Sequence, residues 1–253
     1  MIALKKRKFG CEWEFSSEYD DMLKPVHSVI RSVYGRRYVY SRKDYHDSQK
    51  NKWWHLKTDS TTKTELCTPI STFKDMPKIK AVLRGLAKHS PEITDNDSFH
   101  VHVQASHVPL DRLLIAWLDI EHVVIKCFPA HRRNNDYCER LISYDGNVRN
   151  IASFLEDARS SADSHHAIFS SAYYDERGTI EFRVGEGNVD WRIARNWILF
   201  CLSVIRYAEA LDPIDVLCRS AYNRRYAMSD MIEAMELRDK QLIRWLVDRY
   251  GSA

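Results

Sequence analysis

Two hydrophobic periodicities alternate along the 253 residues of the chain. Where apolar residues occupy every second position we predict half-buried strands, because successive strand side chains point to opposite faces. Phe9, Cys11, Trp13 and Phe15 give the clearest example. This alternation, together with enrichment in β-branched and aromatic residues, predicts strands over Phe9–Phe15, Trp53–Thr58, Thr64–Thr68, Phe99–Gln104, His166–Tyr173 and Thr179–Val184.

Amphipathic helices are predicted where apolar residues recur at intervals of three and four. The most regular pattern follows Asp190, a suitable N-cap residue, and continues through Trp197 and Ile205. The same reasoning predicts helices near Tyr19–Val33, Phe73–Lys88, Leu110–Lys126, Val148–Arg159, Trp191–Leu211 and Met228–Tyr250.

The order of these elements favours an α+β fold. The predicted strands arrive in close pairs, which favours an antiparallel sheet over a doubly wound parallel one. No internal repeat, low-complexity tract or Gly/Ser linker interrupts the sequence. We therefore predict a single domain over residues 1–253, with a C-terminal helical segment at about 212–253. The basic and aromatic stretch Tyr34–Lys52 is expected to form an exposed loop or an irregular hairpin.

Composition narrows the class of protein. An apolar fraction of 44% and a charged fraction of 29% are typical of a globular chain rather than a disordered one. The formal net charge of +3 is too small to argue for nucleic acid as the main partner, although it leaves a local basic face open. The longest apolar run, Trp197–Ile205, is much shorter than the ~20 residues of a membrane span, so no membrane partner is expected.

Two further features favour a cytoplasmic location. The stretch Met1–Phe15 carries basic residues but lacks the apolar core of a secretory signal. The six cysteines form no CxxC pair, and several lie among apolar neighbours. This distribution is typical of reduced, buried thiols and argues against a zinc ribbon or a disulfide scaffold.

Two glutamates share one face of the first predicted strand. Glu12 and Glu14 alternate with Cys11, Trp13 and Phe15, so the two carboxylates lie on the face opposite the apolar one. At a Cα separation of ~7 Å, two ionised carboxylates repel by about 2.4 kcal/mol at an effective dielectric constant near 20. An exposed face would screen this repulsion, whereas a cleft would require cations there.

A third carboxylate follows a turn. Asp59 and Ser60 precede the polar stretch TTKT, and Glu65 follows that stretch in a predicted strand. A hairpin would bring Glu65 close to the sheet face. Charged residues beside a turn are also commonly just solvated, so this position alone leaves both interpretations open.

Two histidines lie two residues apart in the strand predicted at 99–104. His100 and His102 point to one face, while Val101 and Val103 pack on the other. This spacing suits metal ligands, either for zinc with further His or Cys or for a harder ion with carboxylates. An exposed strand face with two imidazoles is the alternative.

Two segments combine arginines with polar neighbours. Arg132 and Arg133 are followed by two amide side chains, which suits the capture of phosphate or carboxylate, although for this segment taken alone a charged loop is the favoured explanation. Glu181 and Arg183 share a face of the last predicted strand, and Gly185 follows. Glycines there permit a tight turn or close approach of the backbone to a ligand, and an exposed salt bridge is the simpler reading.

In combination these segments indicate more than they do singly. Carboxylates on three strands, histidines on a fourth and several arginines are what a site needs to bind divalent ions and a polyphosphate. Arginines neutralise the charge of a transferring phosphoryl group.

The order of the motifs resembles the amidoligase family, a branch of the glutamine synthetase-like carboxylate–amine ligases. The resemblance runs from about Phe9 to Leu211 and rests on the segments FGCEWEF, DS with ELCTP, HVHV, RRNNDYC and TIEFRVGEG. It implies a curved antiparallel sheet that forms a funnel-shaped active site, with helices packed outside. The family often carries a glycine just before the segment that begins at Glu65, where this chain has Lys63 and Thr64.

The resemblance also implies roles for individual residues, with ATP and Mg²⁺ (or Mn²⁺) as cofactors. The resemblance implies that one histidine of the strand at 99–104, His100 or His102, binds metal. If His102 is the metal ligand, His100 is implied to lie near the nucleotide. Arg183 is implied to contact the ATP phosphates and Arg133 to lie near them. Arg132, Arg183 and Glu65 are implied to be catalytic, and Arg132 and Arg133 to lie at the acyl phosphate or the acid substrate. The implied metal ligands are Glu12, Glu14, Glu65, His102 and Glu181.

The implied function is an ATP-dependent carboxylate–amine ligase that forms an amide bond through an acyl phosphate. Its acid and amine would be an amino acid, a peptide, a protein side chain or a modified nucleotide. The segment Arg36–Trp54 would form a lid, a substrate wall or an exposed loop. A metal-dependent hydrolase or nuclease that uses the Glu/His cluster is the alternative, and a non-catalytic binding protein on the same fold is a third reading. The lack of further His or Asp at zinc spacings argues against the hydrolase.

Overall fold

The computed structural model describes residues 4–35, 39–41, 52–58, 62–133, 135–136, 138–141, 151–212 and 227–251. The chain divides into two compact units. We call Lys5–Val101 with Gly185–Ile198 the carboxylate unit. The remainder, Met1–Leu4, His102–Val184 and Leu199–Ala253, is called the arginine unit.

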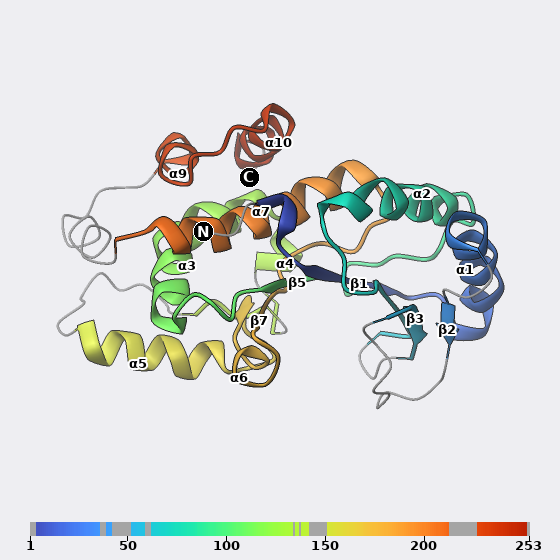
Figure 1. The fold of residues 1–253 in the computed structure, drawn as a ribbon, viewed down its shortest axis with the longest axis horizontal. Helices are drawn as coiled ribbons and strands as arrows, with labels where there is room; N and C mark the ends of the chain where they lie inside the picture. The colour runs from blue at the N-terminus through green and yellow to red at the C-terminus, as the bar shows by residue number, and fades with distance from the viewer. Residues whose placement is uncertain are drawn as a thin grey trace. The chain divides into compact units, whose positions relative to one another are not determined.

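Within the described residues the sheet has seven strands, and the α+β prediction is confirmed (Figure 1). The pairs β1–β4, β3–β4 and β6–β7 are antiparallel. The expectation of a wholly antiparallel sheet is wrong at one place, because β2 pairs with β3 in parallel. A parallel pair needs a long connection, and residues 42–53 supply one between these strands. In order across the sheet, the strands are β2 (Val39–Ser41), β3 (Trp54–Lys57), β4 (Thr64–Cys67), β1 (Phe9–Phe15), β5 (Phe99–Gln104), β7 (Thr179–Phe182) and β6 (Phe169–Ser170).

The carboxylate unit is built on the apolar face of β1. Trp13 is fully buried and stacks on Phe99 of β5, with ring centroids 4.6 Å apart, and lies 6.3 Å from the ring of Trp54 on β3. Leu66 lies opposite Trp13 in the register of β4 and is also fully buried. Figure 1 shows two helices of this unit lying beside each other, and they pack together. These are α1 (Tyr19–Tyr34) and α2 (Met76–Ala87), the latter preceded by the 3₁₀ turn η2 (Phe73–Asp75).

The arginine unit has a separate aromatic core. Trp117 stacks on Phe169 at 5.1 Å, and Phe182 meets Trp117 edge-on at 5.7 Å, so strands β6 and β7 are anchored against one helix. That helix, α3, also packs against α5 and α9. The helical segments here are η1 (Leu4–Lys6, shared by both units), α3 (Leu110–Val124), η3 (Ile125–Cys127), α4 (Ala130–Arg133), α5 (Ile151–Ala162), α6 (Tyr174–Arg177), α7 (Trp191–Ala210, which starts in the carboxylate unit), α9 (Met228–Ala234) and α10 (Lys240–Gly251).

The single helix predicted over Met228–Tyr250 is wrong, because the structure contains two. The first ends at Ala234, and Glu236 has a φ of 47°, in the left-handed region that a helix does not continue through. The guanidinium of Arg206 donates to the carbonyl oxygens of Met235 and Glu236 at 2.6 and 3.0 Å, which satisfies the end of the first helix. The side chain of Asp239 then accepts from two backbone N–H groups at the start of α10.

The strand predicted over His166–Tyr173 is shorter in the structure, and only Phe169–Ser170 pairs with β7. The backbone N–H of Ser171 donates to the carbonyl of Ala162, and Tyr174 then begins α6. The alternation of side chains in the sequence could not reveal that the chain turns away from its partner strand after two residues.

The two glycines after Arg183 have a structural explanation. Gly185 accepts a backbone hydrogen bond from Phe99, and Gly187 donates one to Asp97. A Cβ at Gly185 would lie 2.3 Å from the carbonyl oxygen of Phe99, and one at Gly187 would lie 2.8 Å from Cβ of Asp97. The glycines therefore allow close approach to the neighbouring chain segment within the carboxylate unit.

Replacing Gly185 with alanine is expected to lower the free energy of unfolding by about 2 kcal/mol or more, because the methyl group meets backbone that cannot move freely. Urea unfolding measures this loss. Gly10→Ala is the matched control, since nothing lies within 4 Å of a Cβ there, and its effect should stay within about 0.5 kcal/mol. Equal losses in the two variants would contradict the packing explanation.

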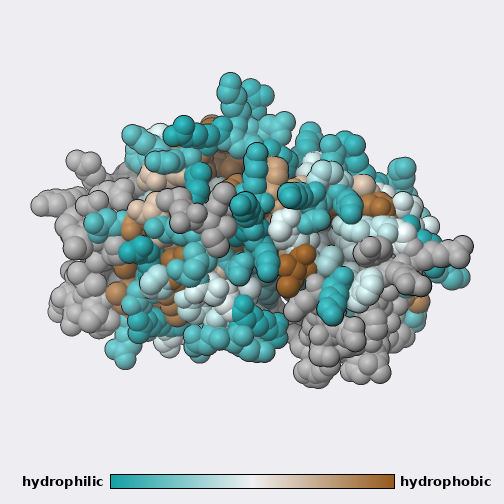
Figure 2. Space-filling model, in the orientation of Figure 1, coloured by the Kyte–Doolittle hydropathy of each residue, from teal (hydrophilic) through white to brown (hydrophobic). Residues whose placement is uncertain are grey.

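Among the described residues, no helix has both the length and the apolar character needed to cross a bilayer. Figure 2 shows hydrophilic residues over most of the described surface on the face it presents. Within the same residues, Ile70 and Val247 are the exposed large hydrophobic side chains, at 51% and 47%. They are single residues and form no continuous patch in the sequence.

Candidate functional site

Three neighbouring strands of the carboxylate unit turn polar side chains to the same face, which we call the carboxylate face (Glu12, Glu14, His55, Lys57, Glu65 and Cys67). The register places Glu14 opposite Glu65 and Glu65 opposite Lys57. In the next row, Glu12 lies opposite Cys67. These positions alternate with the buried apolar residues of the other face, so one hydrophobic core fixes the whole polar row. The prediction that Glu65 reaches the face of the first strand is supported by this register, even though Lys63 and Thr64 replace the expected glycine.

Glu65 is the most enclosed of the three carboxylates, with 3% of the residue exposed. Its Oε1 accepts from the Nζ of Lys57 at 2.9 Å and from the Sγ of Cys67 at 3.0 Å. Burial and the charge of Glu12 raise the pKa of Glu65 to about 8, against the opposing effect of Lys57. Although burial opposes the charge of Lys57, the neighbouring Cys67, Glu65 and Glu12 raise the pKa of its ammonium group overall. The cluster therefore stabilises added positive charge.

Glu14 and Glu12 flank a buried histidine. The backbone N–H of Ser98 donates to Oε2 of Glu14 at 2.8 Å, and the Ser98 hydroxyl donates to the same oxygen. The ring of His100 lies between the two carboxylates, with Nε2 at 3.8 Å from Glu14 and Nδ1 at 4.0 Å from Glu12. Glu12 is the most accessible of these groups, since 26% of its side chain is exposed. It is therefore the carboxylate that a ligand from solvent reaches first.

The donor atoms of this face fit a hard divalent cation. One ligand atom from each of Glu12, Glu65 and Cys67 lies within 4.8 Å of the others. Burial, then the charges of Glu65 and Glu12, raises the pKa of the Cys67 thiol well above its usual range. The other two donors of this group are carboxylate oxygens. Oxygen ligands are those that Mg²⁺ and Mn²⁺ prefer.

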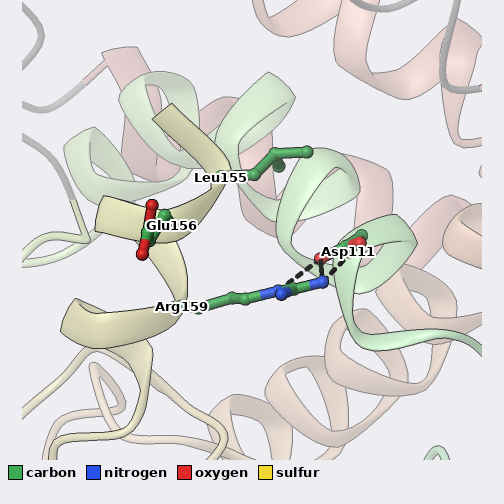
Figure 3. Close-up of a pocket in the computed structure, with 4 residues that line it drawn as sticks. All are labelled: Asp111, Leu155, Glu156 and Arg159. Carbon is green, nitrogen blue, oxygen red and sulfur yellow. Dashed lines mark hydrogen bonds and ion pairs between the residues drawn. The ribbon is translucent and has the colours of Figure 1, made fainter. Parts of the chain in front are cut away.

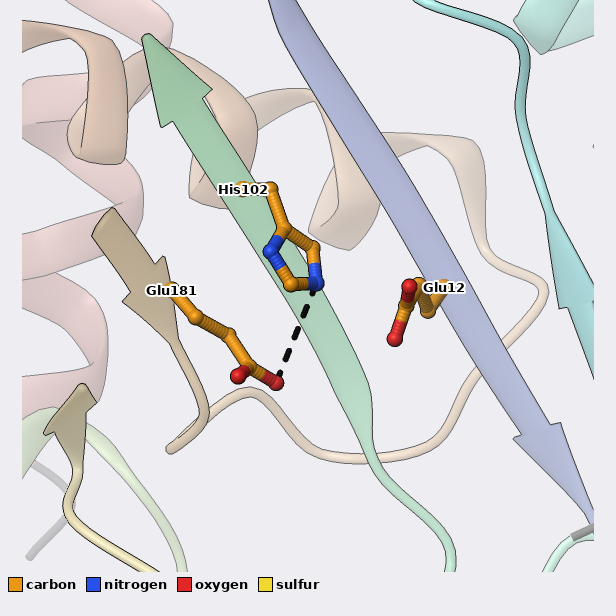
Figure 4. A group of neighbouring side chains, drawn as sticks. All are labelled: Glu12, His102 and Glu181. Carbon is orange, nitrogen blue, oxygen red and sulfur yellow. Dashed lines mark ion pairs between the residues drawn. The ribbon is translucent and has the colours of Figure 1, made fainter. Parts of the chain in front are cut away.

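In the arginine unit, Glu181 and Arg183 do lie on one face of β7 and its extension, as the alternation predicts. Arg183 Nη1 donates to Glu181 Oε1 at 2.6 Å, and Glu181 is 2% exposed. Figure 4 shows His102 of β5 with its ring directed toward Glu181, and Nε2 lies 3.8 Å from the same carboxylate oxygen. One buried carboxylate thus meets an arginine and a histidine.

Arg132 is buried beneath that strand rather than directed to solvent. Its Nη2 donates to the carbonyl oxygen of Arg183 at 2.8 Å and to Sγ of Cys138 at 3.0 Å. The thiol of Cys138 donates to the same carbonyl at 3.2 Å. Arg133 is half-buried at the last position of α4. Arg132 therefore fixes the backbone that carries Arg183.

Some predicted site residues lie outside the described residues. These include Asp59 and Ser60, and also Asn134 and Tyr137 of the arginine-rich segment. Of the stretch expected to form a lid or a substrate wall, Arg36–Trp54, the described parts are Val39–Ser41 and residues 52–54. Its role stays a prediction.

His55, Lys57 and Ser98 lie at this face and were not selected by the sequence analysis; His55 is buried and lies opposite Cys67 in the register of β3 and β4. The sequence did indicate the face on which Lys57 lies. Lys57 follows the apolar Leu56 in a strand, so its side chain points to the face opposite the apolar core. The sequence does not reveal that its neighbour in the next strand is Glu65, because that depends on the register of β3 and β4. Ser98 donates to Glu14 through both its backbone N–H and its hydroxyl, and a single serine just before a strand has no sequence pattern that predicts this contact.

A cavity of about 300 Å³ lies at the surface of α3 and α5 (Figure 3). It is lined by Asp111, Leu155, Glu156 and Arg159, and the guanidinium of Arg159 forms an ion pair with Asp111 at 2.6 Å. None of these residues belongs to the carboxylate face or to the group around Glu181. Two of the four lining residues are therefore paired with each other.

The model of a family described as "Putative amidoligase enzyme" matches residues 5–205, which is more than half of the chain. The matched range includes every residue of the carboxylate face and the group around Glu181. A search of curated proteins finds no match.

Proposed function

This chain belongs to the amidoligase family, and we propose that it joins an acid to an amine in an ATP-dependent reaction. Family membership supports an enzyme that makes amide bonds. The observation that carries the ATP-dependent proposal is the convergence of Glu12, Glu14 and Glu65 on one face of three paired strands. Such a set of carboxylates suits a divalent cation that accompanies nucleotide phosphates.

The proposed reaction has two steps. A carboxylate oxygen of the acid attacks the γ-phosphorus of ATP, the bond to the bridging oxygen breaks, and ADP leaves with an acyl phosphate formed. The amine nitrogen then attacks the acyl carbon, the carbon–oxygen bond to phosphate breaks, and the amine loses a proton. A bound divalent cation supplies positive charge to the phosphates.

The residues of the chain have distinct proposed roles. Glu12, Glu14 and Glu65 hold the cation, and Glu181 with His102 provides further metal ligands. Arg183 contacts the phosphates of ATP. The burial of Arg132 and its bond to the Arg183 carbonyl support a positioning role through Arg183. Arg133 and His100 are proposed to lie near the nucleotide, and these two roles rest on the family resemblance.

The proposed substrates are an acid and an amine. An amino acid, a peptide, a protein side chain and a modified nucleotide all present the required carboxylate or amine. A library of acids and amines screened for ADP release, followed by mass analysis of the products, identifies the pair. ADP release is expected to require Mg²⁺ or Mn²⁺ and to increase on addition of the amine.

An isotope experiment then tests the acyl phosphate. An acid labelled with ¹⁸O in its carboxylate is expected to transfer one labelled oxygen to inorganic phosphate, because the attacking oxygen leaves with the phosphate. Phosphate without the label would contradict the proposed intermediate. Stoichiometric zinc in the purified protein, with hydrolysis in the absence of ATP, would favour the metal-dependent hydrolase instead.

A further inference from the structure

Lys57 is a buried cation at the centre of the carboxylate face. It lies on β3 directly opposite Glu65 of β4, and its Nζ is 2.9 Å from Oε1 of Glu65. The two side chains are 7% and 4% exposed, so water screens the pair little. A lysine so enclosed is rare unless it is paired with a counter-ion.

We propose that the Lys57 ammonium group permanently occupies the cation position beside Glu65, so that the carboxylate face binds one divalent cation fewer than it would without this lysine. The inference rests on the proposed function, because it assumes that the face binds divalent cations. It goes beyond that function because it assigns one positive charge at this face to a side chain of the protein and not to a bound metal ion.

Charge counting supports this division. The ion pair of Lys57 with Glu65 has no net charge, so ionised Glu12 and Glu14 contribute the two negative charges that remain. That is the charge of one divalent cation. A second divalent cation would leave two excess positive charges when Lys57 is present and one when it is absent. Because the Lys57 and Glu65 side chains are only 7% and 4% exposed, water screens this excess little there, so the lysine opposes binding of the second ion.

The arrangement of donors around Glu65 supports it further. Oε1 accepts from Lys57 and also from the thiol of Cys67, so two hydrogen bonds already occupy this oxygen. The pairing of β3 with β4 sets Lys57 at its position opposite Glu65, and the buried neighbours Trp54 and Leu56 anchor the strand. A metal ion would have to displace a tethered ammonium group to use the same oxygen.

The test is to count bound Mn²⁺ per chain in the wild-type protein and in variants at position 57. Lys57→Met removes the charge and keeps most of the side-chain volume. Lys57→Gln also removes the charge but retains an N–H donor for Glu65, so one of the two variants is measurable if the other does not fold. Each is expected to bind one more Mn²⁺ per chain than the wild-type protein, by titration calorimetry and by metal analysis after gel filtration.

Two control variants test whether the additional Mn²⁺ depends on the charges of Lys57 and Glu65. Lys57→Arg keeps the positive charge and is expected to retain the wild-type count. The double variant Lys57→Met with Glu65→Gln removes both partners and should lose the additional ion. A count for Lys57→Met and Lys57→Gln that equals the wild-type count, including no binding in any protein, would overturn the proposal.

The same preparations separate this inference from the proposed function. Metal counting needs neither ATP nor turnover, whereas the proposed function is tested by amine-dependent ADP release. An additional ion in the variants without ADP release from the wild-type protein would support the role of Lys57 and reject the ligase. ADP release with an unchanged count would do the reverse.

Discussion

Replacing Glu12 with glutamine is expected to lower amine-dependent ADP release by about 10²- to 10³-fold and to weaken Mn²⁺ binding, with the fold intact. Glu12 is the most accessible carboxylate of the carboxylate face and lies within 4.8 Å of ligand atoms of Glu65 and Cys67. The substitution exchanges one oxygen for a nitrogen and removes the negative charge that a hard cation requires. Steady-state ADP release and Mn²⁺ titration measure the two effects.

Glu18→Gln is the matched control for this change. Glu18 pairs with Lys63 at the surface, where the two side chains are 65% and 52% exposed. An exposed ion pair of this kind contributes little to stability or to a distant site. Activity and Mn²⁺ binding are therefore expected to be close to those of the wild-type protein. Full ATP turnover in Glu12→Gln would reject the assignment of this residue to the metal site.

Replacing Trp13 with alanine is expected to cause the largest loss of stability, about 3–5 kcal/mol of the free energy of unfolding. Trp13 is fully buried, and its ring stacks on Phe99 and lies near Trp54. Its removal leaves a cavity among rings from three strands, which the rest of the unit fills only in part. Urea unfolding followed by circular dichroism measures the change.

The same variant tests the link between the core and the carboxylate face. Trp13 lies between Glu12 and Glu14 in β1, so a shift of the strand moves both carboxylates. Mn²⁺ binding is expected to weaken in Trp13→Ala and to recover in Trp13→Phe, which restores much of the volume. Trp191→Ala, at a half-buried position at the start of α7, is the control and should cost less. Equal losses at the two tryptophans would contradict the central role of the Trp13 stack.

Much of the fold was predictable from periodicity. The strands Phe9–Phe15 and Phe99–Gln104 have the predicted ends, and the helix from Trp191 ends one residue before its predicted end. In these segments one face is buried against a core, so the chain's own pattern of apolar residues reports its structure. Where another contact sets an end, as Arg206 does after Ala234, the pattern continues and the helix does not.

Those parts of the candidate site that lie within one strand were predictable from the sequence. That Glu12 shares a face with Glu14, and Glu181 with Arg183, follows from the two-residue repeat of a strand. Those relations depend on one segment alone. The pairing of Glu65 with Lys57 and the burial of Arg132 under the Arg183 carbonyl connect distant segments, and no local pattern specifies them.

The sequence by itself determined the α+β class, the faces of the strands and the acidic, histidine and arginine residues that the candidate site contains. The tertiary structure alone decided that β2 joins β3 in parallel, that Gly185 serves backbone contact, and that a lysine neutralises one of three carboxylates. The physical reason is that side-chain periodicity records which face of a segment is buried. It does not record the strand register, and the register decides which charge each buried carboxylate meets.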